Sequence, residues 1–106
     1  MTHYHVVSKW NGNDLQSAKE RLGEQEAIEQ FMKKWDTDDA SWAADQVGKL
    51  FFYETKAEAI EHKSTYGGEI LEVDLDDYEV YVDSFEKFPF TDMAIRAENL
   101  MIVEDK

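Results

Sequence analysis

Two histidines near the N-terminus have the residue types and the spacing of a possible metal site. His3 and His5 lie two residues apart, so in a strand their side chains share one face. Imidazole nitrogens bind zinc and copper. The third histidine, His62, falls in a predicted helix, so no third ligand completes the pattern. We therefore predict no metal site, and we expect both histidines on the polar side of an edge strand.

The acidic stretch 36–45, DTDDASWAAD, is similar in composition to a calcium-binding loop. Such loops require glycine at the sixth position and glutamate at the twelfth. Ser41 and Val47 stand at those positions here. The stretch instead predicts the start of a helix, where acidic residues are stabilised by the helix dipole.

Acidic residues also gather in segment 69–83, EILEVDLDDYEVYVD, which alternates as two strands around Asp76-Asp77. In that register one face of the predicted hairpin is apolar. The other face is predicted to bind a partner and carries Glu72, Asp74, Glu79, Tyr81 and Asp83. Asp74 would then lie opposite Glu79, which is unfavourable for like charges. Either the loop is longer than two residues, or the strands diverge, or this face meets something positive.

The elements that position these residues can be read from periodicity and capping signals. The predicted strands are 3–8, a buried central strand at 49–54, the two strands of 69–83, and 99–105. The predicted helices are a short one capped by Asp14 and ending at Gly23, one over 24–35, one ending at Gly48, and one from the capping box Thr55/Glu58 to Gly67-Gly68. We expect Trp35 in the core.

This order, β-α-α-(α)-β-α-β-β-β, mixes helices and strands without βαβ alternation. It predicts a single α+β domain over 1–106, with a mixed or antiparallel sheet packed against helices. The 24 acidic and 11 basic residues give a net charge of −13. That charge argues against nucleic acids and anionic membranes as partners and favours a basic protein surface. Cysteine is absent, and neither a spanning apolar run nor a signal peptide is visible, so we expect a cytoplasmic protein.

Three stretches, YHVVSKWNG, LFFYETKAEAIEHKSTYGGEILEVDL and AIRAENLMIVED, carry a family resemblance. Their layout resembles small bacterial and phage proteins similar to the ADP-ribosyltransferase fold. The resemblance implies that NAD is held by two elements, His5 with Ser8 and Tyr53 with Thr55. It also implies a later glutamate that orients the ribose, for which Glu72, Glu86 and Glu98 are the candidates. An acidic protein accommodates a pyrophosphate only if a local basic pocket compensates.

Three functions follow from these patterns. The first is an acidic interaction module, such as a phage or mobile-element inhibitor that binds the basic, nucleic-acid-binding surface of a partner and needs no cofactor. The second is an ADP-ribosyltransferase-like enzyme or an NAD-binding remnant. The third is an oligomeric structural or assembly protein. No catalytic residue is assigned, and the sequence favours a protein without enzymatic activity over an enzyme. The first two functions differ in one structural expectation. The second requires that His5, Tyr53 and Thr55 line one cleft, and the first does not.

Overall fold

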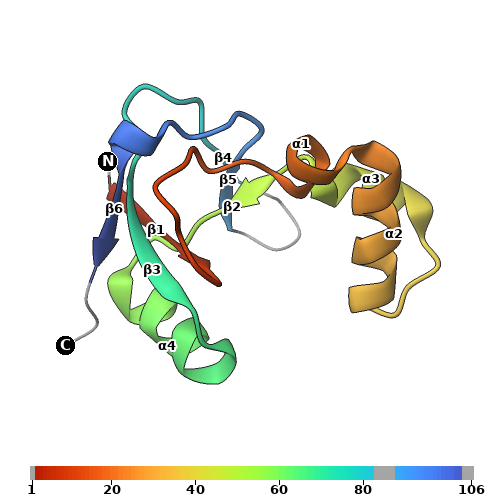
Figure 1. The fold of residues 1–106 in the computed structure, drawn as a ribbon, viewed down its shortest axis with the longest axis horizontal. Helices are drawn as coiled ribbons and strands as arrows, with labels where there is room; N and C mark the ends of the chain where they lie inside the picture. The colour runs from red at the N-terminus through yellow and green to blue at the C-terminus, as the bar shows by residue number, and fades with distance from the viewer. Residues whose placement is uncertain (1, 83–87, 104–106) are drawn as a thin grey trace.

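The structure is a computed structural model that describes residues 2–82 and 88–103. It confirms the predicted α+β class, with two small antiparallel sheets and four α-helices in the described part of the chain. The two sheets lie together, and three of the helices form a separate lobe beside them (Figure 1). Among the described residues, no helix is both long and apolar enough to cross a lipid bilayer.

The first sheet has the order β1-β3-β6, formed by β1 (Thr2–Val7), β3 (Glu69–Asp74) and β6 (Leu100–Val103). Both pairings are antiparallel, with His5 opposite Leu71 and Glu72 opposite Met101. Helix α4 (Lys56–Tyr66) packs against β1 and β3. This helix covers one face of the sheet, and the opposite face is turned toward the core.

The second sheet has the order β2-β5-β4, formed by β2 (Leu50–Phe51), β5 (Pro89–Thr91) and β4 (Tyr81–Val82). The core lies between the two sheets, and its buried members include Leu71 and Val73 from the first sheet and Leu50 beside the second. The prediction of a central strand at 49–54 is wrong, because β2 is at an edge of its sheet. The chain after β2 instead joins the two sheets, through backbone hydrogen bonds between Tyr53 and Tyr4.

The predicted hairpin within 69–83 does not form. Strand β3 pairs with β1 and β6, whereas β4 pairs with β5 in the other sheet. Tyr78 explains the separation, because its ring packs against the core and its hydroxyl accepts hydrogen bonds from the Arg96 N–H and the Asn99 side chain. The chain therefore turns inward at Tyr78. Of the three alternatives given above for segment 69–83, the structure has the second, in which the two strands diverge.

The helical lobe consists of α1 (Ala18–Leu22), α2 (Glu24–Lys34) and α3 (Ala40–Val47), which pack on one another (Figure 1). Ser17, not the predicted Asp14, caps α1. The Asp14 carboxylate instead accepts a hydrogen bond of 2.8 Å from the backbone N–H of Ala97, at the start of the 3₁₀ helix η1 (Ala97–Asn99). Asp14 is held there because its neighbour Leu15 forms a bridge with Ile95, two residues before η1 begins.

Helix α4 begins at the predicted capping box, in which the Thr55 hydroxyl and the Glu58 carboxylate satisfy each other's backbone N–H groups. We expect Thr55→Ala to lower the free energy of unfolding by about 1 kcal/mol, because a free helical N–H loses its acceptor. Urea denaturation measures this change. Thr65→Ala, an exposed change near the end of the same helix, is the control and should leave stability within about 0.5 kcal/mol.

Candidate ligand-binding cleft

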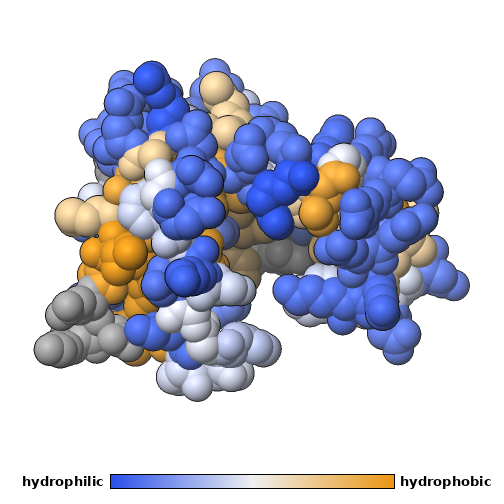
Figure 2. All heavy atoms as spheres, in the orientation of Figure 1, coloured by the Kyte–Doolittle hydropathy of each residue, from blue (hydrophilic) through white to orange (hydrophobic). Residues whose placement is uncertain are grey.

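A hollow of about 640 Å³ separates the helical lobe from the second sheet, and we call it the interlobe cleft. Figure 2 shows the molecule hollowed between the helical lobe and the sheets. Residues of α1, α2 and α3 line one side of the cleft, and Phe51 of β2 and Phe88 line the other. Ligand sites in proteins are typically concave spaces of this size, with apolar walls and a few polar groups.

In the described part of the chain, the charged residues that line the interlobe cleft are all basic: Arg21, Lys34 and Lys49. Among residues 2–82 and 88–103, no aspartate or glutamate lines it, although the chain has 24 acidic residues. Lys49 is held by the Asp45 carboxylate at 2.9 Å and lies 4.5 Å from the centre of the Phe90 ring. Arg21 and Lys34 form no ion pair with any carboxylate in the described part of the chain. The cleft is therefore a local positive site on an acidic protein.

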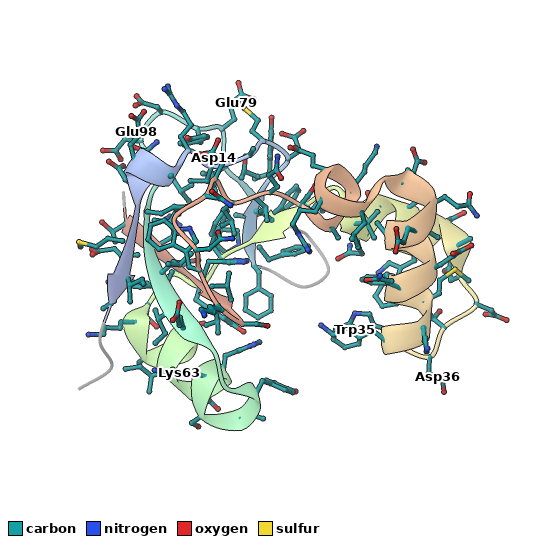
Figure 3. The ribbon with its side chains drawn as sticks, in the orientation of Figure 1. Asp14, Trp35, Asp36, Lys63, Glu79 and Glu98 are labelled. Atoms are coloured by element: carbon teal, nitrogen blue, oxygen red, sulfur yellow. The ribbon has the colours of Figure 1, made fainter. Side chains whose placement is uncertain are left out.

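Aromatic rings form the walls of the cleft: Phe31, Trp35, Trp42, Phe51 and Phe88. The Phe31 ring meets the Trp42 ring edge-on at 4.9 Å between centroids. Trp35 is 57% exposed, so the prediction that it lies in the core is wrong. Trp35 directly follows α2 as its C-cap, and Figure 3 shows its side chain directed from the end of α2 toward the sheets. An exposed indole at the mouth of a cleft is available to a ligand ring.

A second hollow, also of about 640 Å³, adjoins the first and shares Arg21, Lys34 and Lys49 with it. This adjoining hollow is also lined by His5, Ser8, Lys9 and Trp10, and Asp14 is the one acidic residue among its described lining residues. Ser8 is exposed, and the ring of Trp10 packs partly against the core. Two of the four residues that the resemblance assigns to NAD thus lie beside the basic cleft.

His3 and His5 lie toward the core, so the prediction that they occupy a polar face is wrong. Strand β1 has α4 on one side and the core on the other, and alternation places both histidines with the core, opposite Val73 and Leu71. His3 is only 4% exposed, and both rings meet Phe52 edge-on. The sequence pattern could not show this, because it does not say which side α4 covers.

His5 is fixed by one strong hydrogen bond, in which its Nδ1–H donates to the backbone carbonyl of Phe51 at 2.7 Å. The other ring nitrogen, Nε2, is then unprotonated in the neutral tautomer. Burial lowers the pKa of His5 below its ordinary value of 6.5, and this effect outweighs the opposing effect of the hydrogen bond. The imidazole is therefore neutral at pH 7 and can accept a hydrogen bond at Nε2.

The lowered pKa makes stability depend on pH. Below about pH 6.5, His5 binds a proton in the unfolded chain more readily than in the native protein. The free energy of unfolding therefore falls as the pH drops. Above about pH 7.5 this effect is absent, because both states are neutral. As the pH falls through this acidic range, we expect the free energy of unfolding of the wild type to decrease by up to about 1.4 kcal/mol per pH unit more than that of His5→Asn. Urea denaturation at pH values on each side of 6.5 measures this, and parallel pH profiles for the two proteins would contradict it.

Tyr53 and Thr55 do not line the adjoining hollow that His5 and Ser8 line, although the Tyr53 backbone pairs with Tyr4, next to His5. A hydrogen bond of 2.7 Å joins the Tyr53 hydroxyl to Nδ1 of His62, in a third hollow that Phe88 lines as well. Burial, and then the nearby Glu58, raise the pKa of Tyr53. Thr55 serves as the cap of α4. Within the described residues, the four predicted NAD contacts therefore do not line one hollow.

The residues predicted to bind a partner are divided between the two sheets. Glu72 and Asp74 line a hollow of about 370 Å³ together with Asp76 and Glu98. Tyr81 lies in β4 and its hydroxyl donates a hydrogen bond to the Glu79 carboxylate, which raises the pKa of Tyr81. Asp83 and Glu86 lie outside the described residues. Binding to a basic partner stays a prediction.

Two of the three candidate catalytic glutamates, Glu72 and Glu98, therefore lie away from the interlobe cleft. Figure 3 shows Glu98 and Trp35 on opposite sides of the molecule. Residues 2–82 and 88–103 contain no group of three or more histidine, aspartate or glutamate side chains that could hold a metal ion. Comparison with protein-family models, with curated proteins and with solved structures gave no match. The cleft is interpreted from its own geometry.

Proposed function

We propose that the protein binds an anionic ligand that carries a planar ring, of the nucleotide class, in the interlobe cleft. One observation carries this proposal. Of the described residues, basic and aromatic side chains line the cleft and no carboxylate does, on a chain of net charge −13. If charged residues were distributed only to keep the protein in solution, we would expect acidic residues along the cleft, as on the rest of the surface.

The basic residues suit a phosphate group. The guanidinium of Arg21 can bind two phosphate oxygens at once, and the ammonium of Lys34 adds a point charge. Both side chains line the interlobe cleft and the adjoining hollow, so they lie where the two spaces meet. A cleft lined by one sign of charge concentrates ligands of the opposite sign. We place the phosphates at this junction.

The aromatic residues suit the base. A nucleobase that stacks on an aromatic side chain gains about 1–3 kcal/mol. Trp35 is exposed at the cleft, and Phe31 and Trp42 support one another behind it. Lys34 lies 5.6 Å from the centre of the Trp35 ring, so a phosphate at Lys34 and a base on Trp35 would be adjacent.

Of the four residues that the family resemblance assigns to NAD, only His5 and Ser8 lie at the proposed site, so NAD is one member of this class and not the required ligand. His5 and Ser8 line the adjoining hollow, and the basic pocket that a pyrophosphate would require is present beside them. The proposal is for binding and not for transfer, since no glutamate of the described chain lines either hollow. The protein is in this reading closer to an NAD-binding remnant than to an enzyme.

Tryptophan fluorescence tests the proposal, because two of the three tryptophans line the cleft. The protein is titrated with ADP, NAD, adenosine and inorganic pyrophosphate. We expect saturable quenching by ADP and NAD, with adenosine and pyrophosphate at least about tenfold weaker, since each lacks one of the two interactions. Equal affinity for ADP and pyrophosphate would contradict the role of the rings. Absence of any change at millimolar ADP would remove the proposal.

A further inference from the structure

The outer strand of the first sheet, β6, has the features of an unoccupied strand-pairing edge. It stands last in the sheet order β1-β3-β6 within the described part of the chain. Met101 is 58% exposed and Ile102 is 48% exposed, although neighbouring residues of a strand point to opposite faces. Figure 2 shows apolar atoms gathered over this side of the sheet. Part of each face of the strand is therefore exposed, at Met101 and at Ile102, while Leu100 is buried in the core.

Exposed edge strands usually carry a device that blocks pairing with another chain, such as a lysine, a proline or a bulge. The sequence of β6 is Leu-Met-Ile-Val, which contains none of these residues. Its pairing with β3 is regular over four consecutive residue pairs. The outer backbone N–H and C=O groups of β6 are therefore suited to pair with an added strand.

Acidic residues beside β6 indicate the charge of the added strand. Glu72 lies directly opposite Met101, and a hollow next to them is lined by Glu72, Asp74, Asp76 and Glu98. None of the described residues that line this hollow is basic. A second copy of this chain would bring the same carboxylates to the edge, and it would also bring a net charge of −13. Charge therefore favours a basic occupant over self-association.

We infer that β6 takes up an extended, lysine- or arginine-containing segment of a partner protein as a fourth strand of the first sheet. The backbone of the segment pairs with β6, and its apolar side chains cover Met101 and Ile102. Its basic side chains reach the carboxylates of Glu72, Asp74 and Glu98. This surface is distinct from the interlobe cleft, since the two sets of lining residues do not overlap.

The probe is a fluorescein-labelled peptide of alternating lysine and valine, compared with a peptide of alternating lysine and glycine. The two peptides have the same charge, but glycine disfavours the strand. Fluorescence anisotropy should show the valine peptide binding at least about tenfold more tightly. Hydrogen exchange should show slower exchange of the outward-facing amides of β6 when that peptide is bound.

Two double variants with the same change in charge locate the site. Glu72→Gln with Asp74→Asn should weaken binding of the valine peptide at least about fivefold and reduce its salt dependence. Glu20→Gln with Asp38→Asn, both exposed on the helical lobe, is the matched control and should leave binding unchanged. Equal affinity of the two peptides, equal loss in both variants, or unchanged exchange at β6 would each overturn the inference. Dimerisation of the protein alone through β6 would overturn it as well.

Discussion

Gly68→Val should destabilise the protein by about 3 kcal/mol or more, and at this size such a loss removes a large part of the total stability. Gly68 has a φ of 109°, a conformation that residues with a side chain rarely adopt. A Cβ at this position would clash with the backbone oxygen of Val7 and would lie 3.3 Å from Cγ1 of Val6. The Val7 oxygen belongs to β1, which is paired along β3, so it cannot move without breaking the first sheet.

The neighbouring Gly67 provides the matched control. It also has a positive φ, of 78°, but nothing lies within 4 Å of a Cβ built there. Gly67→Val should therefore carry only the cost of the backbone conformation, on the order of 1–3 kcal/mol, without the clash. Urea denaturation of both variants measures the difference. Equal destabilisation would contradict a close approach of Gly68 to β1 and would put the start of β3, and with it the position of His5, in question.

Arg21→Glu combined with Lys34→Glu should abolish ADP binding, with an affinity at least about 100-fold lower than that of the wild type. The two basic residues line both hollows, and each has no ion-pair partner among the described residues. Their replacement turns an attraction for phosphate into a repulsion in the same space. Isothermal titration calorimetry measures the loss, and circular dichroism checks that the helices remain.

The matched control for this variant lies on the same two helices. Lys19→Glu with Lys33→Glu changes the net charge by the same amount at exposed positions of α1 and α2 that do not line the interlobe cleft. We expect this control to weaken ADP binding less than about threefold, through the overall field alone. An equal loss in both double variants would show that net charge, and not the cleft, governs binding.

The local elements could be predicted from the sequence because their signals are short-range. The capping box at Thr55 and the apolar periodicity of 24–35 correspond to α4 and α2. Trp35, the C-cap of α2, is the exception, since periodicity places a residue on a helix face without showing whether anything covers that face. The lobe leaves this end of α2 uncovered, and the indole faces the cleft instead.

The long-range pairing could not be predicted. Alternation in 69–83 describes two strands, but it does not identify their partners, and β3 and β4 pair in different sheets. The sequence carries one signal against the predicted hairpin, because that hairpin would place the like charges of Asp74 and Glu79 opposite each other. The interlobe cleft could not be predicted either, because Arg21, Lys34 and Lys49 are far apart in the chain and only the packing of the lobe brings them together.

Three tryptophan indole N–H signals in an NMR spectrum of the ¹⁵N-labelled protein test the central claim most directly. Trp35 and Trp42 line the interlobe cleft, whereas the indole of Trp10 donates a hydrogen bond of 2.7 Å to the backbone oxygen of Asn13 in the adjoining hollow. On titration with ADP, we predict saturable shifts of the Trp35 and Trp42 signals that exceed any shift of Trp10. If those two signals stay in place at millimolar ADP, the interlobe cleft does not bind a nucleotide.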